Sequence, residues 1–212
     1  MSKPIVYGPS YSTYTRSVRL ALEEKGAEYD LVEIDFMASG FPPGYEKRHP
    51  FSKVPAFSHG DFDIYETGAI VRYVDQAFDG PSLMPAPARE AVRVNQCMGI
   101  IDAYAYQAMV HDVFVQRAMV PQQGGETDEE KVAAGQAQSK KSLTALAELG
   151  GGADWLAGAT YSLADLYFAP IMVYYAQTPE GKSALERCAP IARWWDRMSA
   201  RDTMAKTTGP LG

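Results

Sequence analysis

The stretch "HPFSKVPAF", residues 49–57, joins a loop to a short run of strand-forming residues. Pro55 stands where that strand would begin, and a proline there removes a hydrogen bond from a sheet. A cis peptide bond between Val54 and Pro55 would place the proline in a tight turn. The backbone N–H and C=O of Val54 would then point outward and could bind an extended peptide as a neighbouring strand does. The stretch therefore predicts a peptide-binding edge beside a strand.

The stretch "YETGAI", residues 65–70, follows this edge and opens a helix at Glu66 and Thr67. A helix N-terminus offers free N–H groups and positive potential, which suit a carboxylate. The side chain of Glu66 could pair with an ammonium group. One ligand with a carboxylate, an ammonium and a peptide backbone would satisfy all of these groups.

The first eighty residues predict the order strand, helix, strand, loop, two strands, helix. The strand "PIVYG" precedes a helix over residues 13–25, and the run "YDLVEIDF" alternates apolar Val32, Ile34 and Phe36 with acidic residues. A β-α-β unit implies parallel strands. Two short strands about a turn at His59 and Gly60 and a helix from Thr67 complete an α/β domain over residues 1–79.

Residues 80–88, rich in Pro and Gly, read as a linker, and residues 89–212 read as an all-helical domain. Apolar helical patterns cover residues 88–119, 128–149, 162–177 and 189–200. In the stretch "SLADL", Ser162 and Asp165 have the spacing of a capping box.

The composition excludes several classes of protein. The net charge of −6 argues against nucleic acid as the main partner, because phosphate binding needs clustered Lys and Arg. The two cysteines form no CxxC motif and fit a reducing compartment, and we find neither a signal peptide nor a membrane span, so the cytoplasm is expected. The histidines are scattered without ligand spacing, so no metal site is expected.

The stretch "GPSYSTYTRSVR", residues 8–19, crowds hydroxyl groups where a helix begins: seven of the eight residues from Ser10 to Ser17 carry one. One of them could cap the helix, or one could point at an anion held there.

The whole chain resembles a cytosolic glutathione transferase. "HPFSKVPAF", "ETGAI" and "SLADL" are similar to three motifs of that family and follow one another at matching spacing. The resemblance implies a thioredoxin-like N-terminal domain, an all-helical C-terminal domain and glutathione as co-substrate, with no metal. It also implies a homodimer, in which Phe51 matches an aromatic side chain that inserts into the partner subunit.

The helix start is most similar to the serine-type, phi-like members. The match implies that Ser12 donates a hydrogen bond to the sulfur of glutathione, which would favour the thiolate, the nucleophilic form. Tyr7 is the rival, since it ends the first strand near the catalytic tyrosine of other classes. Ser10, Thr13 and Thr15 are interpreted as cap or turn residues. Arg16 could support an electropositive site, but is interpreted as a solvated helix arginine.

The resemblance also implies a glutathione-binding set: Lys53, Val54, Pro55, Glu66 and Thr67. Phi-like members hold the glycine carboxylate of glutathione with a His-Lys pair, but the loop "SGFPPGYEKRHP" lacks that pair. Lys53 could take part of this role or be a surface lysine, and His49 is interpreted as structural. A bacterial or fungal phi-like member fits this departure as well.

An electrophilic second substrate would contact aromatic and polar side chains: Tyr11, Tyr104, Gln107 and His111, with Phe36, Tyr106 and Phe114 as further candidates. The expected reaction is attack of the glutathione thiolate on a small apolar electrophile. Two alternatives stay open: a protein that binds glutathione or an apolar ligand without turnover, and a glutathione-dependent peroxidase or thiol reductase.

Overall fold

The computed structural model describes residues 2–209. It divides into two compact units: the chain up to Leu83 together with the segment from Arg201 onward, and residues 84–200. The sequence-based division, with a linker at 80–88 and a helical domain over 89–212, differs from these units, because the last segment is grouped with the first one. Hydrogen bonds from Arg16 and Arg19 to Thr207 hold the last segment to the first one.

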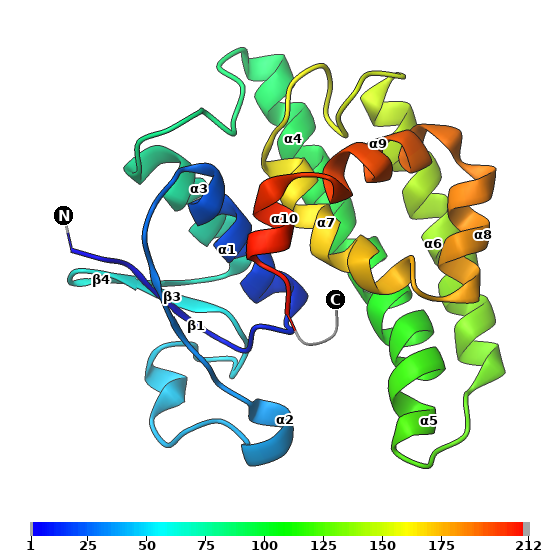
Figure 1. Cartoon of the computed structure of the whole chain (residues 1–212), viewed down its shortest axis with the longest axis horizontal. Helices are drawn as coiled ribbons and strands as arrows, with labels where there is room; N and C mark the ends of the chain where they lie inside the picture. Colours follow the sequence, from blue (N-terminus) through cyan, green and yellow to red (C-terminus); the bar gives the residue numbers. More distant parts are fainter. Residues whose placement is uncertain (1, 210–212) are drawn as a thin grey trace. The chain divides into compact units, whose positions relative to one another are not determined.

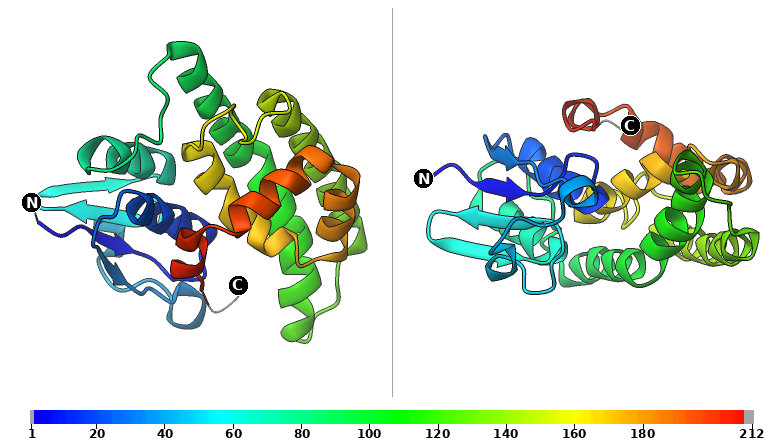
Figure 2. Two further views of the ribbon diagram at one scale, coloured as in Figure 1. Left: turned by 45° about the horizontal axis from the view of Figure 1, so that its top comes forward. Right: turned by 90° about the horizontal axis from the view of Figure 1, so that it is seen from below.

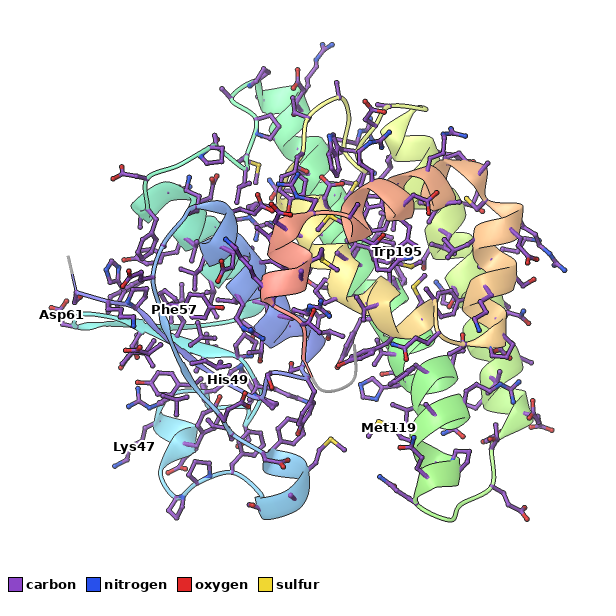
Figure 3. All side chains as sticks on the ribbon, viewed as in Figure 1. Lys47, His49, Phe57, Asp61, Met119 and Trp195 are labelled. Atoms are coloured by element: carbon purple, nitrogen blue, oxygen red, sulfur yellow. The ribbon has the colours of Figure 1, made fainter. Side chains whose placement is uncertain are left out.

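The first unit is built on a four-stranded sheet. Its strands are β1 (Ile5–Tyr7), β2 (Asp30–Val32), β3 (Ala56–His59) and β4 (Phe62–Tyr65), in the order β2-β1-β3-β4 (Figure 1). β1 and β2 are parallel, as predicted, and the other neighbours are antiparallel. Asp61 lies at the tip of the β3–β4 hairpin (Figure 3). The sheet confirms the thioredoxin-like α/β domain.

The second strand is shorter than its alternating pattern suggested. β2 ends at Val32, and Phe36 begins a short helix, α2 (Phe36–Ser39). The Asp35 side chain caps that helix by accepting from the N–H of Ala38 at 3.1 Å. The prediction of a strand through Phe36 was therefore wrong in its second half. Ile34 is buried as expected, whereas Val32, inside β2, is 42% exposed.

Two helices accompany the sheet, α1 (Thr13–Glu24) and α3 (Thr67–Ala77), and they pack against each other. α1 ends as predicted: Gly26, just beyond Lys25, has φ +64°, the left-handed conformation that glycine adopts readily. The loop between α2 and β3 contains one short 3-10 turn, η1 (Tyr45–Lys47).

The helix α10 (Asp202–Lys206) lies beside α1 in the ribbon (Figures 1 and 2), although almost the whole chain separates them in sequence. Arg16 donates to the carbonyl of Met204 at 3.0 Å and to the hydroxyl of Thr207 at 3.3 Å. Arg16 is only 5% exposed, so its interpretation as a solvated arginine was wrong.

The second unit is helical throughout its regular structure. Its elements are α4 (Ala88–Ile100), the π-helical η2 (Ile101–Ala105) and η3 (Gln107–Met119), α5 (Val120–Gln122), α6 (Glu129–Gly150), α7 (Leu163–Tyr175), α8 (Pro179–Arg187) and α9 (Ala189–Ser199). α7 packs against α4, η3, α8 and α9, and nearly all its side chains are buried. The predicted capping box of Ser162 and Asp165 is confirmed. None of the helices within residues 2–209 is long and apolar enough to span a membrane.

Candidate functional site

Ser12 is the residue that caps α1. Its hydroxyl oxygen accepts a hydrogen bond from the backbone N–H of Thr15 at 3.3 Å, and its carbonyl accepts from Arg16 N–H at 2.9 Å. A serine hydroxyl has one hydrogen to donate besides its two lone pairs. The cap uses only a lone pair, so the Ser12 hydrogen can still be donated to a group beyond the helix N-terminus, where the helix dipole favours an anion.

The neighbouring hydroxyl residues are turned into the protein. Thr13, Thr15 and Ser17 are buried, and Ser17 donates to the carbonyl of Thr13 at 3.2 Å. The Thr15 hydroxyl packs against Gly8, where a Cβ atom would meet it at 2.4 Å. Ser10 contributes its backbone N–H, which donates to the Glu33 carboxylate at 3.0 Å. Of these side chains, that of Ser12 alone occupies the cap position.

Tyr7, the rival of Ser12, has a packed ring. The guanidinium carbon of Arg48 stands 4.1 Å from the ring centroid, within the range of a cation–π interaction. The ring also packs against the cluster of Ile34, Tyr45 and Ala56. These contacts favour a structural role for Tyr7.

The predicted peptide edge has the expected backbone geometry. The Val54–Pro55 bond is cis, which confirms that prediction. Among residues 2–209, no hydrogen bond uses the backbone N–H or C=O of Val54, so neither group is paired within the described part of the chain. The hydroxyl of Tyr45 donates to the carbonyl of Lys53 at 2.9 Å and fixes the chain just before this edge.

Glu66 stands at the N-cap of α3 with an unusual backbone. Its φ is +70° and its ψ is 112°, and its side chain makes no cap hydrogen bond. Within the described part of the chain, Ser52 is the other non-glycine residue with positive φ, at 47°. Such conformations cost about 1–3 kcal/mol and concentrate at ligand-binding sites. Ser52 directly precedes the predicted binding residues Lys53, Val54 and Pro55. Glu66 directly precedes Thr67, another residue of that set.

His49 is buried beside this strained segment. Its ring centroid lies 4.9 Å from that of Tyr65, and within residues 2–209 its Nδ1 has no hydrogen-bond partner. Burial lowers the pKa of His49; Glu66 opposes this shift and Lys53 adds to it. The imidazole is therefore neutral at neutral pH, and both charged residues act on it electrostatically.

The candidates for a second substrate have varied surroundings. In the first unit, the Tyr11 hydroxyl donates to Asp35 at 3.2 Å, and burial, with that hydrogen bond second, raises the pKa of Tyr11 to about 12. In the helical unit, Tyr104 is 55% exposed and Gln107 donates to Asp112 at 2.9 Å.

Two further candidates of the helical unit contact aromatic side chains of that unit. His111 contacts the Tyr106 hydroxyl at 3.2 Å. Phe114 is buried and stacks on Tyr174 with ring centroids 4.6 Å apart, so it is a core residue rather than a pocket residue. Within the described residues, no group of three or more His, Cys, Asp or Glu side chains has the arrangement of a metal site.

Three features of the site were not predicted from the sequence. The strain at Ser52 has no sequence signal, because serine is common in ordinary turns. The hydrogen bond from Tyr45 to Lys53 depends on a loop whose path was not predicted. The burial of Arg16 depends on its contacts with the segment that starts at Arg201. Only a recognised partner for Arg16 near the end of the sequence could have predicted that burial.

Comparisons with known proteins match both parts of the chain. Residues 3–76 match the family model of the glutathione S-transferase N-terminal domain, and residues 106–202 match that of the C-terminal domain. The probable glutathione S-transferase GSTF1 of Oryza sativa subsp. japonica is 30% identical over 206 residues, covering 95% of this chain and 93% of the relative.

Solved structures give the same result. Glutathione transferase F7 from Populus trichocarpa superposes with a TM-score of 0.86 at 26% identity, covering 96% of this chain and 97% of that one. Glutathione S-transferase I from mais, in complex with an atrazine glutathione conjugate, gives 0.84 at 28% identity, covering 97% and 96%. With both domains matched in order and a relative similar over almost its full length, the chain belongs to the glutathione S-transferase family.

Proposed function

We propose that the protein is a serine-type, phi-like glutathione transferase that joins the glutathione sulfur to a small apolar electrophile. The observation that carries this proposal is the position of Ser12: it caps α1 through an oxygen lone pair, and its hydroxyl hydrogen is left for an anion. Relatives support the reaction, since one solved structure holds an atrazine glutathione conjugate and another holds lactoylglutathione.

The chemical step begins with loss of the thiol proton of glutathione. A free thiol has a pKa near 8.5, so only a few per cent is thiolate at neutral pH. The Ser12 hydroxyl and the N-terminus of α1 would both stabilise the negative sulfur and lower that pKa. The sulfur lone pair then forms a bond to the electrophilic carbon. In substitution the leaving group departs with its electron pair, and in addition the neighbouring atom takes up a proton.

The binding set would hold the tripeptide around this sulfur. The N–H and C=O of Val54 would pair with the backbone of the glutathione cysteine, with Pro55 fixing the turn. The N-terminus of α3 at Thr67 would bind the glutamyl carboxylate, and Glu66 its ammonium. Lys53, which is exposed, would meet the glycine carboxylate.

The test is a titration of the thiol of bound glutathione, followed by the ultraviolet absorbance of the thiolate. We expect a pKa well below that of free glutathione in the wild type, moved upward by Ser12→Ala. Ser10→Ala is the matched control, because Ser10 lies in the same turn and contributes its backbone N–H to Glu33. Equal pKa values in the wild type and Ser12→Ala would refute the role of Ser12.

The same titration, together with a peroxide-reduction assay, separates the alternatives. Binding of glutathione without a shift in its thiol pKa would favour a non-catalytic binding protein. The altered loop before His49 supports that alternative. Reduction of cumene hydroperoxide with no conjugation activity would favour the peroxidase.

Tyr11, Tyr104, Gln107 and His111 would contact the electrophile. Tyr11 is the sharpest test, because its hydroxyl donates its hydrogen to Asp35 and keeps an oxygen lone pair for a neighbouring ligand. Tyr11→Phe removes the hydroxyl and keeps the ring, so we expect altered preference among electrophiles with unchanged affinity for glutathione. A change in glutathione affinity alone would contradict this role.

Phe51 supports a homodimer, because it is 69% exposed although it is a large apolar side chain. The ring is therefore accessible to a partner subunit, which would remove its apolar area from water. Phe51→Ser should raise the dimer dissociation constant without lowering the stability of the monomer. Sedimentation velocity measures the first quantity, and an unchanged dissociation constant would contradict the assignment.

A further inference from the structure

The segment Arg201–Gly209 is fixed to α1 at both ends of its short helix. At the start, Arg201 donates to both carboxylate oxygens of Glu24, at 3.0 and 2.6 Å, and Thr203 donates to the same carboxylate at 2.6 Å. Lys206 forms an ion pair with Glu23 at 3.6 Å. These contacts use the last turn of α1 and dock the beginning of the segment there.

Thr207 of the segment is held by two buried arginines that lie on earlier turns of α1, Arg16 and Arg19. Thr207 is fully buried; its hydroxyl accepts from Arg16 at 3.3 Å and its carbonyl accepts from Arg19 at 3.1 Å. Arg16 also donates to the carbonyl of Met204. Arg16 and Arg19 are 5% and 8% exposed, so each guanidinium depends on protein acceptors in place of water.

The end of the segment reaches the turn before Ser12. A Cβ atom on Gly209 would lie 2.7 Å from the carbonyl oxygen and 3.1 Å from the carbonyl carbon of Ser10. Real Cβ atoms do not approach backbone that closely, so glycine is required for this contact. The Ser10 peptide belongs to the turn that the Ser12 N–H closes by donating to the carbonyl of Pro9 at 3.0 Å.

We propose that Arg201–Gly209 is a positioning element for Ser12. The hydrogen bond between Arg16 and Thr207 fixes the position of the segment along α1. Gly209 packs against the turn of residues 9–12, and this contact fixes the direction of the Ser12 hydroxyl. The segment itself touches no reacting atom in this proposal. Its effect on catalysis rests on the proposed function of Ser12, but its effect on the turn does not.

The test compares Gly209→Ala with Gly99→Ala. Gly99 lies on α4, where an added Cβ meets nothing within 4 Å, so the control makes the same chemical change at an open position. In Gly209→Ala we expect amide hydrogen exchange of Ser12 and Thr15 to accelerate about tenfold or more, because their N–H groups are held by the turn and by the Ser12 hydroxyl.

The second readout is catalytic. Displacing a reacting group by about 1 Å can cost about a hundredfold in rate. We expect Gly209→Ala to raise the thiol pKa of bound glutathione and to lower kcat by between about tenfold and a hundredfold, with little change in KM for glutathione. Thr207→Val, which keeps the shape of the side chain but removes the acceptor for Arg16, should shift both readouts in the same direction.

The outcomes separate the two proposals. If the wild type shows no thiolate absorbance, the proposed function fails, while amide exchange still decides whether the segment holds the turn. Unchanged exchange at Ser12 and Thr15 in Gly209→Ala would overturn the inference. Faster exchange with unchanged thiol pKa and kcat in an active enzyme would also overturn it, because the segment would then only stabilise the fold.

Discussion

The backbone N–H of Thr15 donates to the hydroxyl oxygen of Ser12 across 3.3 Å, and this bond joins two roles in one side chain. As an acceptor, Ser12 satisfies one of the N–H groups that every helix leaves unpaired at its start. A hydroxyl that accepts a hydrogen bond is polarised toward donating its own hydrogen more strongly. Capping and sulfur binding are therefore compatible uses of one hydroxyl.

The two roles predict different responses to two substitutions. Ser12→Ala should lower the free energy of unfolding by about 1 kcal/mol, whereas Ser12→Gly should lower it by only a few tenths, because glycine is an acceptable N-cap. Neither variant has a hydroxyl, so both should lose the shift in thiol pKa. Denaturant unfolding measures the first quantity and thiolate absorbance the second. If Ser12→Gly lowered the thiol pKa of bound glutathione as much as the wild type does, the helix N-terminus alone would account for the lowered pKa.

Glu66 combines a strained backbone with a proposed ligand contact. Glycine tolerates positive φ, so Glu66→Gly should raise the free energy of unfolding by about 1 kcal/mol. The same change removes the carboxylate for the ammonium of glutathione and should raise KM for glutathione. Glu66→Gln is the control: it should keep the strain and lose the charge. If Glu66→Gly destabilised the protein, the strain argument would be refuted.

Much of the architecture followed from local patterns. The capping box at Ser162, the C-terminal glycine of α1 and the cis Val54–Pro55 bond each depend on residues close in sequence, and each was predicted. α8 was missed although Thr178 caps it and Pro179 begins it, a pairing that sequence reasoning could have used.

Other features depend on contacts that no local pattern contains. The burial of Arg16 arises from Thr207, and the backbone strain at Glu66 arises from how β4 enters α3. Phe36 continued an alternating pattern and still began a helix, because the Asp35 cap competed with the strand. The residues proposed to contact the electrophile are divided between the two units. That they form one binding site therefore stays a prediction.

The two cysteines should differ sharply in reactivity. Cys97 is fully buried; burial raises the pKa of its thiol to about 12, and its Sγ lies 3.7 Å from the carbonyl of Leu156. Because the thiolate is the reactive form, Cys97 should resist thiol reagents in the folded protein. Cys188 is half-buried and should react first. Ellman's reagent should therefore label one thiol rapidly in native protein and two in denaturant, and Cys188→Ser should abolish the rapid phase. Rapid labelling that survives in Cys188→Ser would contradict the burial of Cys97.

Asp165 should give the fold a pH dependence of defined sign. Its carboxylate accepts from the N–H groups of Leu156 and Ser162, the Ser162 hydroxyl and the indole of Trp194, yet burial raises its pKa to about 6. An unfolded aspartate titrates near 3.9, so the folded state binds the proton more tightly. The stabilisation is fully present below pH of about 4 and is lost as the pH rises through about 6.

A pKa of about 6 in the folded state against about 3.9 in the unfolded state corresponds to about 3 kcal/mol. Asp165→Asn cannot titrate, and its amide group meets the Ser162 N–H as a second donor, so it should be less stable than the wild type at every pH. Urea unfolding from pH 4 to pH 7 should show the stability difference between wild type and Asp165→Asn shrinking by about 2 kcal/mol as the pH rises. A difference that grows with pH would mean that the four donors outweigh burial and that Asp165 is held as the carboxylate in the folded protein.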